Sequence, residues 1–236
     1  MTMSAQETTT ATPERAEPRA GLSGDRALRL LLGVIAAVLV VLSAKAPVWE
    51  MKLTAPQYPK GLLLTAYGDR VDGDVGEINE LNHYVGLGEF NIADVPERKL
   101  WLPAIGAALV AVIVGSVLPR KHWLGRLARI GLWLVPIGAL VAIQYRLYLY
   151  GHDIDAGAPI HLDPFMPLVV GPTQVLNFHT SAMPGTAVWL LSAAAFLVMF
   201  GPGIVRRVRQ RMARSAEERA AAGAEGGEAP AAAASP

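Results

Sequence analysis

Long apolar runs alternate with polar, proline-rich connections along this chain. A helix needs about 20 apolar residues to cross the hydrocarbon core of a membrane. Four runs satisfy this length, at residues 27–47, 100–118, 124–150 and 184–205. The pattern predicts an all-α membrane protein, a four-transmembrane-helix bundle in which residues 48–99 and 151–183 form two structured loops and residues 119–123 a short connection.

The composition supports a membrane protein and sets the two ends of the chain apart from the bundle. Hydrophobic residues make up 52% of the chain and charged residues 17%, whereas soluble domains carry about 25% charged residues. The flanking segments are residues 1–26 and 206–236. Residues 206–214 are basic, and the outermost tails, residues 1–24 and 215–236, are rich in Ala, Glu, Pro, Thr and Gly. Such segments bury too little apolar surface to offset the entropy of ordering, so we expect both termini to be disordered.

The distribution of Lys and Arg predicts the orientation, because these residues are enriched on the cytoplasmic side of membrane spans. Basic residues cluster before the first span, around residues 119–123 and directly after the fourth span. Residues 151–183 hold no Lys or Arg, and residues 48–99 hold five basic residues against nine acidic ones. We therefore expect a multi-pass protein of the cytoplasmic membrane, with both termini cytoplasmic and both large loops external.

The first span also has features of a cleaved signal peptide, namely a basic flank and the small residues Ala44 and Ala46. Its apolar run is longer than that of a usual signal peptide, and Pro47 follows the position where cleavage would occur. Both features favour a retained membrane anchor, while cleavage stays open at the level of the sequence.

The predicted spans lack the side chains that most membrane chemistry needs. Their interiors contain no Asp, Glu or His, and the chain contains no Cys. Proton-coupled transport usually needs a carboxylate or histidine within the membrane, and a haem between spans needs axial histidines. The net charge of +1 gives no indication of nucleic-acid binding. We interpret the spans as an anchor in the lipid bilayer and expect specific chemistry in the external loops.

The first external loop has local patterns that predict ordered structure. Pro56 and Pro59 force an extended backbone around Gln57 and Tyr58. After them, residues 62–67 are typical of a strand, residues 68–73 of a turn and residues 75–85 of a short helix.

The predicted helix at residues 75–85 carries a compact group of polar side chains. Asn79 and His83 lie four residues apart and therefore share a helix face. Asn82 and Tyr84 lie beside them, so this group is expected close to the outer membrane surface.

The second external loop is rich in proline and apolar residues and is expected to fold down against the membrane surface rather than project as a domain. The two loops together carry four histidines: His83, His152, His161 and His179. Imidazole is a suitable copper ligand, but no H-x-H or M-x-x-M spacing is present. A copper site formed by these histidines and a hydrogen-bonding or docking role both stay open, and the second is the commoner role for such loop residues.

Three segments of the chain resemble a known family. They are APQYPKGL at residues 55–62, GEINELNHYVGL at residues 76–87 and GHDIDAGAPIHLDPFMPLVVG at residues 151–171. They resemble segments of a small multi-span membrane protein encoded in many nitrous-oxide reductase gene clusters and sometimes called NosB. The resemblance covers both loops and the four-span layout, and it implies an accessory protein that supports a periplasmic copper enzyme.

The resemblance implies a family pattern that it does not connect with any catalytic role. The matching positions are Pro56, Gln57, Tyr58, Pro59, Asn79, Asn82, His83, Tyr84, His152 and Asp155. The candidates for binding an external protein partner are Pro56, Gln57, Tyr58, Pro59, Asn79, Asn82, Tyr84 and Asp155.

Two functional hypotheses follow. The first is a membrane accessory protein for an external metalloenzyme, in nitrous-oxide reductase maturation or copper handling. The alternative is a non-catalytic anchor or assembly subunit whose loops dock a protein partner. A membrane enzyme using His83 with Glu77 or Asp155 ranks below both, because no nucleophile elbow, phosphate-binding loop or metal-hydrolase motif is present.

Overall fold

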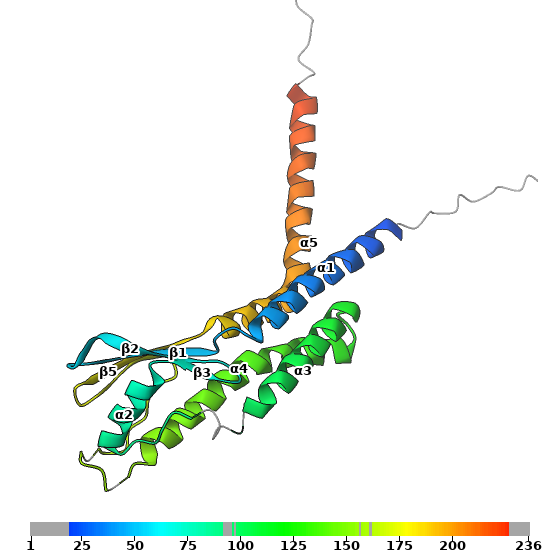
Figure 1. Ribbon diagram of the computed structural model, residues 1–236. Coiled ribbons are helices and arrows are strands. Elements are labelled where there is room, and N and C mark those ends of the chain that lie inside the picture. The colour runs from blue at the N-terminus through cyan, green and yellow to red at the C-terminus, as the bar shows by residue number, and fades with distance from the viewer. Residues whose placement is uncertain (1–18, 92–95, 97, 156, 161, 227–236) are drawn as a thin grey trace, which may run out of the picture.

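The computed structural model describes residues 19–91, 96, 98–155, 157–160 and 162–226. Four helices in these ranges are long and apolar enough to cross a membrane: α1 (Arg19–Ser43), α3 (Arg98–Val117), α4 (Trp123–His152) and α5 (Thr186–Gly226). They overlap the four predicted spans and support a multi-pass membrane protein. Consecutive helices run in opposite directions, so both ends of the described chain lie at one end of the bundle (Figure 1).

Small side chains let the four helices pack closely. Ala36 of α1 and Ala187, Ala194 and Ala195 of α5 are fully buried in the core of the bundle. In a bilayer, such close packing replaces the hydrophobic effect as the main source of helix association. Large apolar side chains such as Leu134 are exposed on the outside of the bundle, where lipid tails would cover them.

The two large loops fold into one sheet, so the prediction of a purely α-helical protein is wrong. The first loop supplies β1 (Trp49–Ala55), β2 (Tyr58–Ala66) and β3 (Val71–Gly73), and the second supplies β4 (Gly171–Val175) and β5 (Phe178–Pro184). In the described residues these form a five-stranded antiparallel sheet in the order β3-β2-β1-β5-β4. A lone hairpin is marginally stable in water, whereas a sheet with a covered face is stable.

The second loop therefore does not fold flat against the membrane surface. Its β4–β5 hairpin pairs with β1, with Trp49 opposite Pro184 near the bundle and Thr54 opposite His179 further out. The backbone N–H of Gly185 donates to the carbonyl oxygen of Val48 across 2.9 Å at the point where the sheet meets the bundle. We call this end of the molecule the sheet end. The opposite end, where the described part of α1 begins and the extension of α5 leaves the bundle, is called the basic end.

The helix α2 (Val75–Val85) coincides with the predicted helix and covers one face of the sheet. The side chain of Asp74, just before α2, accepts a hydrogen bond from the backbone N–H of Leu63 on β2 across 2.8 Å. Ile78 on α2 is fully buried against Met51, Leu53 and other apolar residues of the sheet. The alternating burial of β1 matches this arrangement, because only one face of the sheet is covered.

Helix α4 belongs to both the bundle and the sheet end. Leu132 near its middle is fully buried in the bundle core, whereas Leu147 near its end is buried in the core beneath the sheet. The side-chain amide of Gln144 donates to the carbonyl oxygen of Pro167 and accepts from the backbone N–H of Val169, both across 2.9 Å. One continuous helix thus joins the two parts of the molecule.

The ends of the chain are more helical than the composition predicts. α1 begins at Arg19, within the arm expected to be disordered, and α5 continues past the basic residues 206–214 to Gly226, into the tail expected to be disordered from residue 215. Ala, Arg and Glu have high helix propensity. The costly first turn is already formed in the spanning part of each helix, so extending the helix beyond the bundle requires only propagation. α5 changes direction where it leaves the bundle, and Pro202 is the proline inside this helix (Figure 1). The predicted disorder of residues 1–18 and 227–236 lies outside the described residues.

Candidate functional site

Two hairpin turns lie side by side at the outermost part of the sheet end. Ala55 pairs with Tyr58, which makes Pro56 and Gln57 the turn between β1 and β2. Val175 pairs with Phe178 in the same way, which makes residues 176–177 the turn between β4 and β5. Because β1 and β5 are paired as far as Thr54 and His179, the two turns are neighbours, and Figure 1 shows both far from the bundle. We call them the paired tips.

The paired tips expose their side chains, and one of their residues has an unusual backbone conformation. Pro56 and Gln57 are exposed, and Leu176 is 53% exposed with a positive φ of 52°. A non-glycine residue at positive φ is uncommon and is a reason to look for function. Of the four predicted partner-binding residues in this segment, Pro59 is also exposed, whereas Tyr58 is half-buried and packs against the core beneath the sheet.

A bulge in β2 follows the first tip. The pairing of β1 with β2 changes register between Leu53 and Ala55, and Gly61 has a positive φ of 82°. Such irregularities bend and twist a strand locally. The bulge sets the direction in which residues 56–59 leave the sheet.

The face of the sheet opposite α2 is open in the described structure. Alternation along the strands places Lys52, Leu63, His179 and Met183 on this face, and all four are exposed. Leu63 and Met183 are 55% and 54% exposed. The open face is therefore polar with isolated apolar side chains and runs from the bundle to the paired tips.

Asn79 and Asn82, two of the predicted partner-binding residues, make bonds within the protein. The Asn79 side-chain oxygen accepts from the backbone N–H of Phe90 across 2.8 Å, and the buried Asn82 amide donates to the carbonyl oxygen of Gly88 across 3.4 Å. These bonds fold residues 86–90 back over α2. Phe90 then stacks on Tyr150 of α4, with ring centroids 4.6 Å apart.

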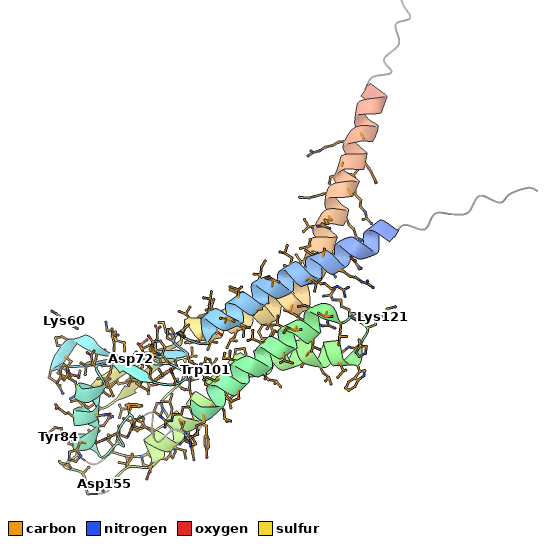
Figure 2. All side chains as sticks on the ribbon, turned by 45° about the vertical axis from the view of Figure 1, so that its right-hand side comes forward. Lys60, Asp72, Tyr84, Trp101, Lys121 and Asp155 are labelled. Atoms are coloured by element: carbon orange, nitrogen blue, oxygen red, sulfur yellow. The ribbon has the colours of Figure 1, made fainter. Side chains whose placement is uncertain are left out.

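Tyr84 and Asp155 lie at the opposite edge of the sheet end from the first tip, where α2 ends. Figure 2 shows them together at one corner, far from Lys60 beside the tip. The backbone N–H of Asp155 donates to the carbonyl oxygen of Gly86 across 2.8 Å, and its side chain accepts from Gly157 at the same distance. The carbonyl oxygen of Tyr84 accepts from the N–H of Ile160 across 3.2 Å, while the Tyr84 side chain is 60% exposed. The geometry gives Asp155 a loop-fixing role and leaves Tyr84 available for contact.

The candidate metal ligands are distributed over different surfaces. His83 is exposed on α2, His179 is exposed on the open face of the sheet, and the sheet core lies between them. The Nδ1 atom of His152 lies 2.9 Å from the carbonyl oxygen of Tyr148, and the two rings are in contact. His161 lies outside the described residues. Among the described residues, no group of three or more His, Cys, Asp or Glu side chains could hold a metal ion.

An apolar cavity lies beneath the sheet and was not predicted from the sequence. It has a volume of about 70 Å³ and is lined mainly by Leu53 and Phe178 of the sheet, Val85 of α2, and Leu147 and Tyr150 of α4. The cavity depends on contacts between residues about 100 positions apart, for which a single sequence offers no periodic signal. Its walls are mostly apolar, with Asn82 and Thr180 as polar members of the lining.

No known family model matches this chain, and none of the curated proteins matches it.

Proposed function

We propose that this protein is a non-catalytic accessory subunit of the cytoplasmic membrane that docks an external protein through its sheet end. In this proposal both termini are cytoplasmic and the paired tips are the contact region. Following the resemblance to NosB-like proteins, the partner is the periplasmic copper enzyme nitrous-oxide reductase. The lipid bilayer holds the bundle, and the protein performs no reaction of its own.

The observation that carries the proposal is the assembly of the three resembling segments into one folded unit. Residues 55–62 form the first tip, residues 76–87 form α2 and its end, and residues 151–171 connect α4 to β4. The last two are bonded directly, through Gly86 with Asp155 and Tyr84 with Ile160. The three segments thus belong to one folded unit, which holds the paired tips in a fixed position, as expected of a docking module.

The distribution of charge supports the proposed orientation. The basic end carries Arg120, Lys121 and the arginines that begin the extension of α5. Residues 151–183, at the sheet end, contain no Lys or Arg. Positive residues are retained on the cytoplasmic side, so the sheet end belongs outside.

Docking has more support than copper handling. His83 and His179 lie on separate surfaces, and no group of three metal-ligating side chains is found among the described residues. The paired tips, by contrast, carry the exposed residues Pro56, Gln57 and Leu176 on adjacent turns. We therefore favour the assembly role over direct metal transfer.

Site-specific photo-crosslinking tests the proposal. A photoreactive side chain is placed at position 57 or at position 176, and the protein in nanodiscs is mixed with purified nitrous-oxide reductase. Controls carry the same side chain at Glu80 on α2 or at Lys121 at the basic end, both exposed. We expect a defined crosslink from positions 57 and 176 and none from the controls.

Two results would contradict the proposal. Equal crosslinking from all four positions would show non-specific contact, and no crosslinking from either tip would remove the tips from the interface. The substitutions Gln57→Ala and Tyr58→Ala give a second readout: they should abolish recovery of the partner without changing the copper content of the purified protein.

A further inference from the structure

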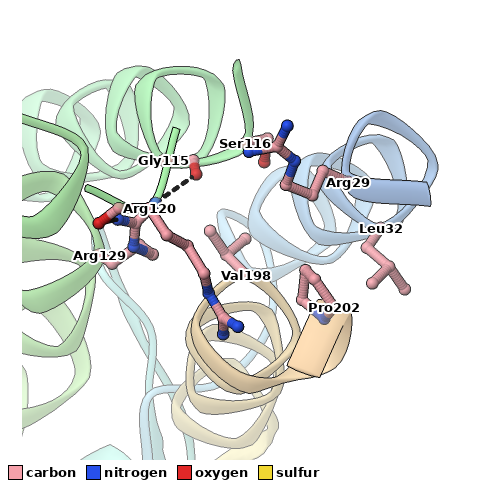
Figure 3. A pocket seen from close by; sticks show the side chains of 8 residues that line it. All are labelled: Arg29, Leu32, Gly115, Ser116, Arg120, Arg129, Val198 and Pro202. Atoms are coloured by element: carbon pink, nitrogen blue, oxygen red, sulfur yellow. Dashed lines mark hydrogen bonds between the residues drawn. The ribbon is translucent and has the colours of Figure 1, made fainter. Parts of the chain in front are cut away.

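Three arginines line one small cavity at the basic end of the bundle. Arg29 comes from α1, Arg120 from the connection before α4, and Arg129 from the second turn of α4 (Figure 3). Together with Ser116 at the end of α3 and Val198 and Pro202 of α5, they line a small cavity between the helices. We call these three side chains and Ser116 the arginine cluster.

The hydrogen bonds of the cluster hold the arginines in place but do not neutralise them. Arg129 is 7% exposed and donates to the carbonyl oxygens of Gly115 across 2.9 Å and of Arg120 across 3.3 Å. Arg120 donates to the carbonyl oxygen of Met199 across 2.6 Å, and Arg29 to that of Asp25 across 3.2 Å. Every one of these acceptors is an uncharged backbone carbonyl.

No carboxylate of the described residues lines the cavity. The Asp25 side chain is instead 3.9 Å from Arg206, at an exposed position. Arg129 is buried, and a buried charge without a counter-charge is costly. The half-buried Arg29 and the exposed Arg120 add like charge beside it. An anion in the cavity would offset this cost.

The cavity also contains a polar atom that has no bonding partner. Ser116 is 6% exposed, and its hydroxyl makes no hydrogen bond in the described structure. Buried hydroxyls are normally hydrogen-bonded, so an unpaired one indicates a missing partner. The space beside it is about 10 Å³, which corresponds to about one oxygen-sized atom.

Glycines keep this space open. A Cβ at Gly33 would lie 2.5 Å from the Ser116 hydroxyl oxygen, and one at Gly115 would lie 3.1 Å from the Arg129 side chain. A Cβ at Gly203 would lie 3.1 Å from a terminal nitrogen of Arg120. The helices approach closely around the polar groups because these positions lack side chains.

We propose that the cavity lined by the arginine cluster binds a phosphate group, with one phosphate oxygen inserted beside Ser116. Guanidinium groups recognise phosphate through paired, charge-assisted hydrogen bonds. Basic pockets between spanning helices on the cytoplasmic side are suited to anionic lipid headgroups. The phosphate is supplied either by an anionic phospholipid or by free inorganic phosphate.

Binding by the detergent-purified full-length protein tests this proposal. Native mass spectrometry and thermal unfolding are followed with short-chain phosphatidylglycerol, with inorganic phosphate, and with diacylglycerol as a control that lacks phosphate. Phosphatidylglycerol binding that phosphate does not displace identifies the lipid as the source. Saturable binding of inorganic phosphate alone identifies the free anion.

Matched charge removal separates the cluster from general surface attraction. The double variant Arg29→Gln with Arg120→Gln should raise the Kd by about fivefold for each arginine removed. The control Arg209→Gln with Arg214→Gln removes the same charge from the exposed extension of α5 and should leave the Kd within about twofold. Ser116→Ala, which changes no charge, should raise the Kd by roughly two- to threefold.

Three results would overturn the proposal. They are binding of neither phosphate compound, equal loss in the two double variants, and an unchanged Kd in Ser116→Ala. Far-ultraviolet circular dichroism of each variant ensures that the comparison is made between folded proteins.

Discussion

The indole N–H of Trp49 donates to the carbonyl oxygen of Val169 across 2.7 Å, joining β1 to the segment just before β4. Trp49 is 3% exposed and also belongs to the core beneath the sheet. A single side chain thus links the two loops that lie between different pairs of spans. The sheet end is consequently one folded unit rather than two independent loops.

Substitution of Trp49 tests this linkage. Trp49→Phe keeps an aromatic ring but removes the donor, which leaves the Val169 carbonyl without this bond. An unpaired buried carbonyl costs about 1–3 kcal/mol, and we expect a loss of stability of that size. Denaturant unfolding in detergent measures it, with Trp189→Phe as the control because Trp189 is 65% exposed on α5. Equal stability of the two variants would show that the bond does not stabilise the fold.

A second contact, between Gly68 and Trp101, ties the sheet to the start of α3. Any Cβ at position 68 would collide with the Trp101 ring, whose N–H donates to the carbonyl oxygen of Ala44 across 3.0 Å. Gly68→Ala should therefore destabilise the protein by roughly 1–3 kcal/mol through overpacking. A thermal-unfolding comparison with Gly76→Ala checks this result.

Gly76 is a suitable control because it lies in α2 with nothing near its missing Cβ. Alanine is favoured over glycine within a helix by about 0.5–1 kcal/mol, so Gly76→Ala should be neutral or stabilising. If both Gly68→Ala and Gly76→Ala lost stability, the loss at position 68 could not be assigned to the collision with Trp101, and the expected gain in helix propensity at position 76 would be wrong.

The spans and α2 could be predicted from the sequence because each is specified by local pattern. A run of about 20 apolar residues permits few alternatives, and residues 75–85 follow Asp74 and precede Gly86, which caps the helix with a φ of 75°. The sheet could not be predicted in this way, because it depends on pairing between strands that are far apart in the sequence. Residues 49–55 alternate apolar and polar side chains, yet their partner β5 lies about 130 residues later.

The candidate site was predictable to a similar extent. The prolines of residues 56–59 mark the first tip, but nothing local indicates that residues 176–177 lie beside it. Asn79 and Asn82 stand out as a polar pair on a helix, and only the fold shows that they bind the backbone of residues 88–90. The burial of Arg129 was not predictable either, because it depends on the packing of α3 against α4, which no local pattern indicates.

The bond from Phe90 to Asn79 predicts a local change in dynamics. Asn79→Ala removes the acceptor for the Phe90 N–H and should loosen residues 86–90 while the sheet stays intact. Hydrogen exchange at the Phe90 amide should accelerate by about fivefold or more, since a protecting bond worth about 1 kcal/mol or more is lost. Glu80→Ala, at an exposed neighbouring position, should leave this rate unchanged, and equal acceleration in both variants would contradict the assignment.

Leu176 offers a way to separate stability from docking. Its φ of 52° is costly for a residue with a Cβ, and in a two-residue hairpin turn the first central position with positive φ is normally glycine. Leu176→Gly should therefore stabilise the fold, by about 1 kcal/mol. The same change removes an exposed apolar side chain from the paired tips, so recovery of nitrous-oxide reductase in the crosslinking experiment should fall. A higher unfolding midpoint together with lower partner recovery would indicate that the strain at Leu176 is retained for binding. Unchanged recovery would exclude Leu176 from the interface.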